Sequence, residues 1–281
     1  MRLDKLGRHF GIELYAKVET FHPTGSHKDR ESEAVVDDAS RKGYKGVGCA
    51  STGNAGISLA AFAFSLRLKC HVYVSDEISS ERLTLLRMFH PVVHRVRGTY
   101  EEAYRISNFE IAKLGLYNAN PGRCEAKIVG NSLIGVEIGR AIEPSVVICP
   151  TNNGTHLAGV WKGLNDLGQS CRMVAAVTKR SAIADSISGF HRLDALQFSK
   201  AMNASKGTAV EVTDNEIRKA AVWLAGQQIF CEPAGAAGLA ALNHLRVESG
   251  SIVCSTVTGS GMKFPRLMNK IYRTLPEALP R

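Results

Sequence analysis

Pro23-Thr24-Gly25-Ser26-His27-Lys28-Asp29-Arg30 joins the first strand pattern of the chain to its first helical pattern. Apolar and polar residues partly alternate over residues 12–18, as in a β-strand, and residues 29–42 have a helical pattern that ends near Gly43. The octapeptide therefore predicts a strand-to-helix junction that carries Lys28. Two interpretations stay open here: a polar loop with a helix-capping serine, or a lysine at an active-site edge, acting as a Schiff-base amine or a phosphate ligand.

The same order of strand, polar loop and helix recurs along the rest of the chain. Further strand patterns cover residues 46–50, 70–74, 92–96, 145–149, 173–177, 209–212 and 251–257. Helical patterns separate most of them, and this alternation predicts an α/β fold with mostly parallel, doubly wound sheets that are covered on both faces. Ligands bind at the carboxyl ends of the strands in such sheets. We therefore expect the polar loops that follow the strands to share one edge.

The length and composition of the chain suit a large core. Its 281 residues, 44% of them hydrophobic, suffice for one large domain or two closely joined lobes. No linker rich in Pro, Gly or Ser separates the halves, so two lobes that share a cleft explain the pattern better than separate domains. We place a smaller lobe at residues 36–140, and a larger lobe at residues 1–35 and 141–281.

The distribution of charge and apolar residues excludes several classes of protein. The net charge is +9, but Lys and Arg are scattered and are not interleaved with aromatic residues, so nucleic-acid binding is not expected. A basic balance also suits an enzyme with anionic ligands. No apolar run reaches the roughly 18 residues of a membrane span. No apolar run follows Met1-Arg2-Leu3-Asp4-Lys5 either, so we expect no signal peptide and a cytoplasmic protein.

The cysteines indicate buried thiols and not a metal or disulfide framework. The chain has 7 of them, no two in a Cys-x-x-Cys pair, and Cys49, Cys70, Cys149 and Cys254 lie in or beside strand patterns. Free cysteine behaves as a small buried apolar residue. We therefore predict reduced thiols, no disulfide and no bound metal.

Two of the polar loops have the composition of anion sites. Ser51-Thr52-Gly53-Asn54-Ala55-Gly56 precedes a helical pattern, so its small residues and the helix dipole could hold a carboxylate, with the Asn54 amide on a ligand oxygen. Thr151-Asn152-Asn153-Gly154-Thr155 precedes another helix and suits a phosphate, although it matches neither the P-loop nor the dinucleotide fingerprint. Ordinary helix capping is the alternative for both loops.

A third loop, Thr258-Gly259-Ser260-Gly261, follows the last clear strand pattern. It predicts a tight turn in which Thr258 offers a neutral hydroxyl to a heteroatom. The loops and Lys28 together supply an amine, a carboxylate site, a phosphate site and a neutral hydroxyl. Pyridoxal 5′-phosphate (PLP), which has an aldehyde, a phosphate and a pyridine nitrogen, would use this whole set with an amino-acid substrate.

The motifs also resemble those of a known family, the tryptophan-synthase-β family of PLP enzymes (fold type II), and within it threonine synthase. Residues 23–30 are similar to its lysine motif Pro-Thr-Gly-Ser-Phe-Lys-Asp-Arg, with His27 in place of Phe. Residues 51–56 resemble its substrate-carboxylate loop, and Asn120-Pro121-Gly122-Arg123 resembles Asn-Pro-Tyr-Arg. Residues 232–237 and 258–263 look like its late motifs. The motifs occur in family order over nearly the whole chain.

The resemblance implies a role for each matching residue toward the cofactor. Lys28 would be the Schiff-base lysine, and would act as general base at the substrate Cα once released. Asn54 would bond the phenolic oxygen, and Thr258 would face the pyridine nitrogen. The 5′-phosphate would be held by Asn152, Asn153, Gly154 and Thr155. A neutral hydroxyl at the pyridine nitrogen does not enforce ring protonation, which favours elimination and replacement over transamination.

The resemblance further implies a substrate site and a reaction. Ser51, Thr52 and Gly53 would hold the substrate carboxylate, and Asn120 and Arg123 would lie near a distal phosphate, for which the guanidinium fork of arginine is suited. We expect a lyase of amino-acid biosynthesis that catalyses β- or γ-elimination or replacement, with O-phosphohomoserine and water giving threonine and phosphate as the leading reaction. The resemblance also suggests a homodimer.

Two alternatives remain open at this point. The first keeps the cofactor and changes the reaction to that of a serine or threonine dehydratase, or of a β-replacement synthase of the cysteate or cysteine synthase type. The second is a binding or regulatory protein that has the fold of a PLP enzyme without its catalysis.

Overall fold

The computed structural model describes residues 1–189 and 191–272. Contacts between residues divide the chain into two compact units. Unit 1 contains Met1–Phe21 and the described residues from Asn131 onward, and unit 2 is His22–Gly130. The boundary lies inside helix α6 (Ala126–Ala141). Each unit is built on its own parallel sheet, which confirms the predicted α/β fold.

Unit 1 is built on a five-stranded sheet in which all neighbouring strands are parallel. In spatial order the strands are β1 (Glu13–Val18), β9 (Ile252–Val257), β6 (Val146–Pro150), β7 (Arg172–Val177) and β8 (Thr208–Glu211). The loops predicted to bind ligands follow β6 and β9 directly. In a parallel sheet these two loops lie at the same edge.

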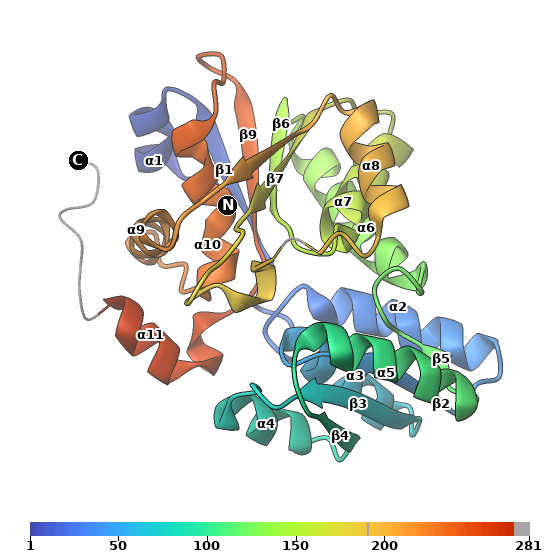
Figure 1. The fold of residues 1–281 in the computed structure, drawn as a ribbon. Helices are drawn as coiled ribbons and strands as arrows, with labels where there is room; N and C mark the ends of the chain where they lie inside the picture. The colour runs from blue at the N-terminus through green and yellow to red at the C-terminus, as the bar shows by residue number, and fades with distance from the viewer. Residues whose placement is uncertain (190, 273–281) are drawn as a thin grey trace. The chain divides into compact units, whose positions relative to one another are not determined.

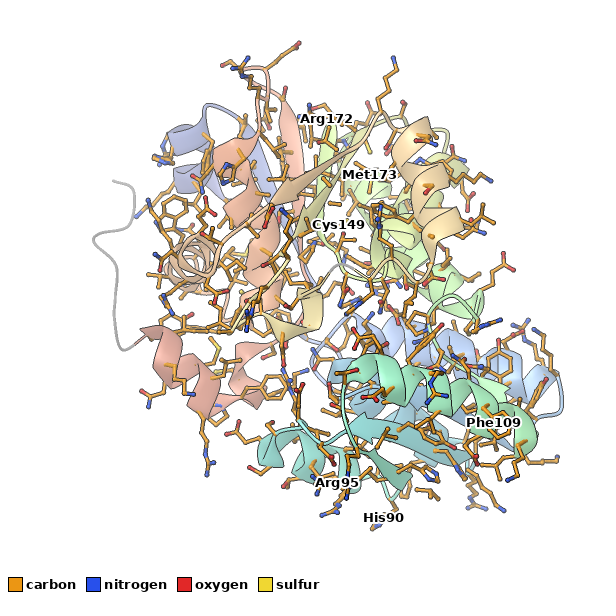
Figure 2. The ribbon with its side chains drawn as sticks, viewed as in Figure 1. His90, Arg95, Phe109, Cys149, Arg172 and Met173 are labelled. Carbon is orange, nitrogen blue, oxygen red and sulfur yellow. The ribbon has the colours of Figure 1, made fainter. Side chains whose placement is uncertain are left out.

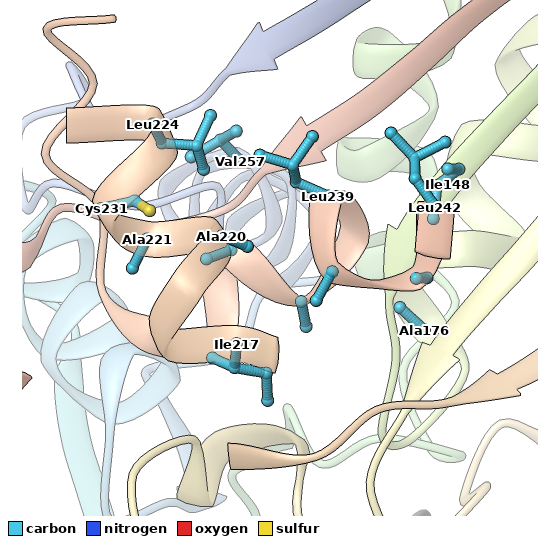
Figure 3. Packing of buried hydrophobic residues seen from close by; sticks show 14 of the residues in the cluster. Ile148, Ala176, Ile217, Ala220, Ala221, Leu224, Cys231, Leu239, Leu242 and Val257 are labelled. Carbon is cyan, nitrogen blue, oxygen red and sulfur yellow. The ribbon is translucent and has the colours of Figure 1, made fainter. Parts of the chain in front are cut away.

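The strands of unit 1 distribute alternate side chains between two apolar cores, as buried parallel strands do. Val146 and Ile148 of β6 lie in one core, part of which is drawn in Figure 3, and Val147 and Cys149 lie in the other. The first core includes residues of the helices α1 (Asp4–Phe10), α9 (Asp214–Ala225), α10 (Pro233–Ala240) and α11 (Pro265–Tyr272). The second core includes residues of α6, α7 (Thr155–Asp166) and α8 (Ala195–Ala204). Helices therefore cover both faces of the sheet (Figure 1).

Unit 2 repeats this architecture on a four-stranded parallel sheet. Its strands in spatial order are β4 (Val92–Val96), β3 (Lys69–Ser75), β2 (Gly46–Ala50) and β5 (Tyr117–Asn118). One face packs on α2 (Lys28–Arg41), α3 (Asn54–Ser65) and α4 (Ser80–Arg87). The other face packs on α5 (Tyr100–Lys113).

The boundaries of the units differ from the predicted lobes. The prediction divides the chain at residues 36 and 140, whereas the contacts divide it at His22 and Gly130, so that Lys28 belongs to the smaller unit. The reason is helix α2, whose Val35, Val36 and Ala39 are fully buried in the same core as Ile57 of α3. A strand-to-helix junction alone does not reveal which core the helix will join.

Several elements also differ in detail from the sequence patterns. The patterns predict no helix over residues 4–10 or 126–141, where the structure has α1 and α6. Helix α2 begins at Lys28 itself instead of the residue after it. The remaining described elements are the 3-10 helices η1 (Asp185–Ile187), η2 (Ala241–His244) and η3 (Gly261–Lys263).

The cysteines are all buried, as predicted, and all of them are free in the structure. Cys149 of β6 and Met173 of β7 lie in the interior of unit 1, where Figure 2 labels them. Burial raises the pKa of Cys49 to about 11 and that of Cys231 to about 12, so these thiols are neutral and unreactive at neutral pH. Within residues 1–189 and 191–272, no helix has the length and apolar character needed to cross a bilayer.

Candidate active site

Lys28 is the first residue of α2, three residues after a tight turn that spans His22 to Gly25. The carboxylate of Asp29 fastens this turn, because it accepts a hydrogen bond from the Thr24 backbone N–H at 2.6 Å and another from the Thr24 hydroxyl. Gly25 has a φ of +77°, a conformation that favours glycine. These bonds connect the turn to the first residues of α2, and they position the backbone of Lys28.

Ser26 does not cap this helix, contrary to the first interpretation of the octapeptide. The N-cap residue is His27, and its side chain makes no capping hydrogen bond. The Ser26 hydroxyl is fully buried and has no hydrogen-bond partner among the described residues. A buried hydroxyl without a partner costs free energy, so the Ser26 hydroxyl is an unused hydrogen-bonding group two residues before Lys28.

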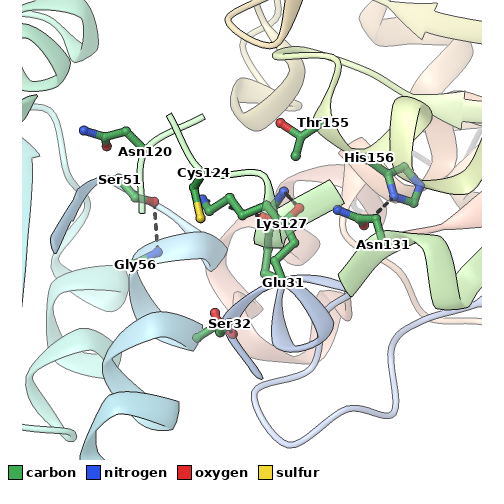
Figure 4. Close-up of polar contacts among 12 residues, drawn as sticks. Glu31, Ser32, Ser51, Gly56, Asn120, Cys124, Lys127, Asn131, Thr155 and His156 are labelled. Atoms are coloured by element: carbon green, nitrogen blue, oxygen red, sulfur yellow. Dashed lines mark hydrogen bonds and ion pairs between the residues drawn. The ribbon is translucent and has the colours of Figure 1, made fainter. Parts of the chain in front are cut away.

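The Lys28 amine lies against a buried carboxylate that the sequence patterns do not identify. Lys28 Nζ is 2.5 Å from Glu31 Oε1, and only 2% of the Glu31 side chain is exposed, compared with 23% for Lys28. Lys127 Nζ lies 3.7 Å from the second oxygen, Glu31 Oε2 (Figure 4). One signal was present in the sequence: Glu31 stands four and eight residues before the buried Val35 and Ala39, on the same stripe of the helix.

The Ser51 hydroxyl accepts hydrogen bonds at the N-terminus of α3, where Gly53 is the N-cap residue, so it serves the capping role that was the alternative for this loop. The Ser51 hydroxyl accepts hydrogen bonds from the N–H groups of Gly53 at 3.2 Å and Gly56 at 3.0 Å (Figure 4). Asn54 is the first residue of α3, so the positive end of the helix dipole lies at this loop. Capping and anion binding are compatible here, because a helix N-terminus has several N–H groups to satisfy.

Asn120 is used to hold the end of β2 in place. Its side chain is fully buried; Oδ1 accepts from the Ala50 N–H at 2.7 Å, and Nδ2 donates to Ser107 Oγ at 2.8 Å and to Asn108 Oδ1 at 3.0 Å. The Asn120 amide thus supports the strand that leads into Ser51. Arg123, three residues later, is exposed, and its backbone N–H donates to the Asn120 carbonyl at 3.2 Å.

We expect Asn120→Ala to destabilise the protein by about 1–3 kcal/mol, because the variant leaves the buried Ala50 N–H without its acceptor. Chemical denaturation of the purified variant measures this loss. Asn203→Ala is the matched control, since Asn203 is an exposed residue of α8. A loss for Asn120→Ala no larger than that of the control would show that the Asn120 bonds do not stabilise the fold.

The predicted phosphate loop of unit 1 is held by the segment that precedes α8. Asn152 Nδ2 donates to the carbonyls of Ser186 at 3.2 Å and Ser188 at 3.3 Å, and Asn152 Oδ1 accepts from the His191 N–H at 2.8 Å. The Asn153 carbonyl accepts from the Asp194 N–H at 2.9 Å. The Asn152 side chain therefore shapes the loop. Asn153 Oδ1 is buried and has no hydrogen-bond partner within the described part of the chain.

Gly154 and Thr155 form the junction of this loop with α7. Gly154 is the N-cap residue, with a φ of +89°. A Cβ atom at Gly154 would lie 2.7 Å from Phe198 Cβ, so only glycine fits without movement. The buried Thr155 hydroxyl donates to the carboxylate of Asp194, another residue that the sequence patterns do not identify. The backbone N–H groups at the start of α7 are the donors that suit an anion here.

Thr258 directly follows β9 and is buried. Two residues earlier, Thr256 Oγ1 lies 3.0 Å from His156 Nε2, and His156 Nδ1 lies 3.0 Å from Asn131 Oδ1 (Figure 4). These buried polar groups tie β9 to α7 and α6 within unit 1, next to the loops that end the strands. The sequence patterns give no signal for this use of His156, because its partners are distant in the sequence.

Each unit therefore supplies part of the predicted residue set. Unit 2 has the amine of Lys28, a buried hydroxyl without a partner at Ser26, and the N-terminus of α3. Unit 1 has the Gly154 turn at the N-terminus of α7 and the buried Thr258. An amine, helix N-termini and a neutral hydroxyl are the donors that PLP needs, so the residues fit this cofactor. In the described residues, no cluster of three or more His, Cys, Asp or Glu could hold a metal ion.

A parallel α/β protein with this residue set has the features of a PLP-dependent enzyme. The family model described as "Pyridoxal-phosphate dependent enzyme" matches residues 1–259. The chain therefore belongs to this family, and PLP is its cofactor.

Sequence relatives identify the kind of PLP enzyme. The chain is 33% identical over 307 residues to threonine synthase of Methanocaldococcus jannaschii, covering 94% of this chain and 74% of that protein. It is 29% identical over 305 residues to threonine synthase of Halalkalibacterium halodurans, covering 99% of this chain and 86% of that protein. The chain is a PLP-dependent lyase of the elimination and replacement type, as predicted.

Solved structures confirm fold type II. Maize serine racemase matches with a TM-score of 0.85 and 20% identity, over 97% of this chain and 91% of that chain. Processed threonine deaminase isoform 2 from Solanum lycopersicum matches with a TM-score of 0.82 and 21% identity, over 97% of this chain and 81% of that chain. At these identities the match concerns the fold and not the substrate.

Proposed function

We propose that this protein converts O-phosphohomoserine and water to threonine and phosphate. The observation that carries the proposal is the 33% identity to a threonine synthase over 94% of the chain. The lysine, carboxylate and phosphate motifs that such an enzyme needs are all present in this sequence.

The proposed roles toward the cofactor follow the chemistry of each group. PLP, when bound, supplies an electron sink for negative charge at the substrate Cα. Lys28 Nζ would hold the cofactor covalently and, when released, move a proton at Cα. Asn54 would orient the phenolic oxygen, and Thr258 would offer its neutral hydroxyl to the pyridine nitrogen. The phosphate would bind the loop from Asn152 to Thr155, with Thr155 contributing its backbone, because its hydroxyl donates to Asp194.

The proposed substrate contacts lie on unit 2. Ser51, Thr52 and Gly53 would hold the substrate carboxylate at the N-terminus of α3, where the helix dipole favours negative charge. The exposed Arg123 would bind the distal phosphate through its guanidinium fork. Asn120 would act next to it, and its bonds to Ala50 and Ser107 indicate that it does so chiefly by shaping the loop.

Product analysis with purified, PLP-loaded protein tests the proposed reaction. We expect O-phosphohomoserine to give threonine and phosphate in equal amounts. Serine and threonine, offered separately, would give little keto acid. Rapid formation of keto acid from serine or threonine, without turnover of O-phosphohomoserine, would instead favour a dehydratase.

We expect Arg123→Ala to lower kcat/KM for O-phosphohomoserine roughly 10–100-fold, the value of a lost hydrogen bond to a charged group. Turnover of a substrate without a distal phosphate should change little. Arg105→Ala is the matched control, because Arg105 is an exposed arginine of the same unit. Unchanged turnover of the phosphorylated substrate by Arg123→Ala would overturn the assignment of Arg123.

We also propose that the enzyme works in the cytoplasm as a homodimer. Support for the location comes from its 7 cysteines, which are all free and buried, as is usual in a reducing compartment. Support for the dimer comes from the family resemblance alone. Light scattering on the purified protein measures the molar mass, and a monomeric mass at micromolar concentration would contradict the dimer.

A further inference from the structure

Basic side chains of unit 2 lie around the buried carboxylate of Glu31. Lys28 Nζ is closest, at 2.5 Å from Oε1, and His27 Nε2 lies 3.7 Å from the same oxygen. Lys127 Nζ is 3.7 Å from Oε2, and its side chain is only 7% exposed (Figure 4). The helix dipole of α2 adds positive potential, because Glu31 lies in the first turn.

A carboxylate at 2% exposure needs charge partners, since an isolated buried charge is strongly destabilised. The partners here differ in what they can do. Lys127 is buried and lies on α6, so it stays beside Glu31 Oε2. Lys28 is the proposed cofactor lysine and must leave Glu31 Oε1 when its amine is used. Of the two lysines, Lys127 is therefore a constant partner of Glu31, and Lys28 is a partner only while its amine is not engaged.

We propose that Glu31, backed by Lys127, is the positioning residue of Lys28. Glu31 Oε1 holds the Lys28 amine in place as an ammonium group, and Nζ gives up its proton to solvent when the amine must be neutral to react, so Glu31 stays ionised. Lys127 keeps Oε2 compensated while Lys28 is engaged. This inference rests on the proposed function of Lys28 as the cofactor lysine, and it adds a residue pair that sets the charge and position of that amine.

Amine labelling of the full-length chain, after removal of PLP, tests the proposal without any turnover. The protein is treated with acetic anhydride at one pH near neutrality, and mass spectrometry of peptides measures the acetylation rate of Lys28 relative to exposed Lys45. Only the neutral amine reacts. We expect Glu31→Gln to raise the relative rate roughly tenfold or more, as expected for losing a hydrogen bond between charged groups.

Lys127→Met provides the decisive comparison, because it breaks the same buried ion pair from the other side. Without Lys127, the Glu31 charge is shared with Lys28 alone, so we expect acetylation of Lys28 to become slower. If the pair had only a structural role, both substitutions would change the acetylation rate of Lys28 in the same direction. Glu33→Gln is the matched control, since Glu33 is an exposed carboxylate of the same helix, and it should leave the rate within about twofold. In Glu31→Asp, which keeps a carboxylate, Lys28 should be acetylated more slowly than in Glu31→Gln.

Two results would overturn the proposal. One is an acetylation rate of Lys28 in Glu31→Gln that is indistinguishable from the rate in Glu33→Gln. The other is a rise of this rate in both Glu31→Gln and Lys127→Met. A separate sample, loaded with PLP and reduced with borohydride, locates the lysine that carries the cofactor. Attachment to another lysine would refute the assigned role of Lys28, and it would leave the measured coupling between Lys28 and Glu31 intact. The failure of each idea is therefore distinguishable.

Discussion

Lys28→Ala is expected to abolish turnover, with a fall of at least about 10³-fold in kcat, because the variant loses both the amine that holds the cofactor and the proposed base at Cα. Retention of PLP should fall as well, since only non-covalent contacts would remain. Initial rates with O-phosphohomoserine measure the first effect. Borohydride reduction followed by peptide mass spectrometry measures the second, and it should find the cofactor on the Lys28 peptide of the unmodified protein.

Lys45→Ala is the control for this experiment. Lys45 is an exposed lysine of unit 2, so its loss removes a positive charge without touching the α2 junction. Normal turnover by Lys28→Ala, or attachment of PLP to a different lysine, would refute the proposed role of Lys28. The fold itself should survive the substitution, because Lys127 still lies 3.7 Å from the buried Glu31 carboxylate when the Lys28 amine is lost.

Gly154→Ala should have the second largest effect, on stability and on cofactor affinity together. The φ of +89° disfavours any residue with a Cβ atom, and the new Cβ would lie 2.7 Å from Phe198 Cβ. Backbone strain of about 1–2 kcal/mol and overpacking of about 1–3 kcal/mol give a loss of roughly 2–5 kcal/mol in the free energy of unfolding. Since relief requires movement of the loop before α7, we expect the Kd for PLP to rise at least about tenfold.

Gly168→Ala separates the effect of backbone strain from that of overpacking. Gly168 also has a positive φ, +72°, but nothing lies within 4 Å of the position that its Cβ would occupy. This control should therefore show the backbone strain alone, and normal affinity for PLP. Denaturation curves and PLP titrations of both variants measure the comparison. Equal stability losses in the two variants, with unchanged PLP affinity, would show that the contact with Phe198 does not shape the phosphate loop.

The α/β architecture could be predicted because strands buried on both faces leave a clear trace in the sequence. Residues such as Val146 to Cys149 are apolar at every position, since alternate side chains enter two different cores. Helix α6, in contrast, leaves no clear helical pattern in the sequence. Its Gly135 weakens the helical pattern, yet a Cβ there would lie 2.1 Å from the Val160 carbonyl of α7. The glycine is required by close packing, which local propensity does not contain.

The local structure around the candidate site residues could be predicted where it depends on neighbouring residues, and not where it depends on distant partners. The positions of Lys28 and Asn54 at helix starts follow from neighbouring residues. The bond from Ala50 to Asn120 joins residues 70 positions apart, and that from Thr155 to Asp194 joins residues 39 apart. No short motif can show that these polar side chains are used to hold loops.

Isotope labelling of the reaction tests the central claim most directly. Purified protein loaded with PLP is given O-phosphohomoserine in water enriched in oxygen-18, and the threonine and phosphate are analysed by mass spectrometry. If Lys28-dependent elimination and water addition take place, the carbon–oxygen bond breaks, so the threonine hydroxyl carries oxygen-18 and the phosphate released directly does not. Solvent oxygen found in phosphate with homoserine as the other product, or no release of phosphate, would contradict the proposed function.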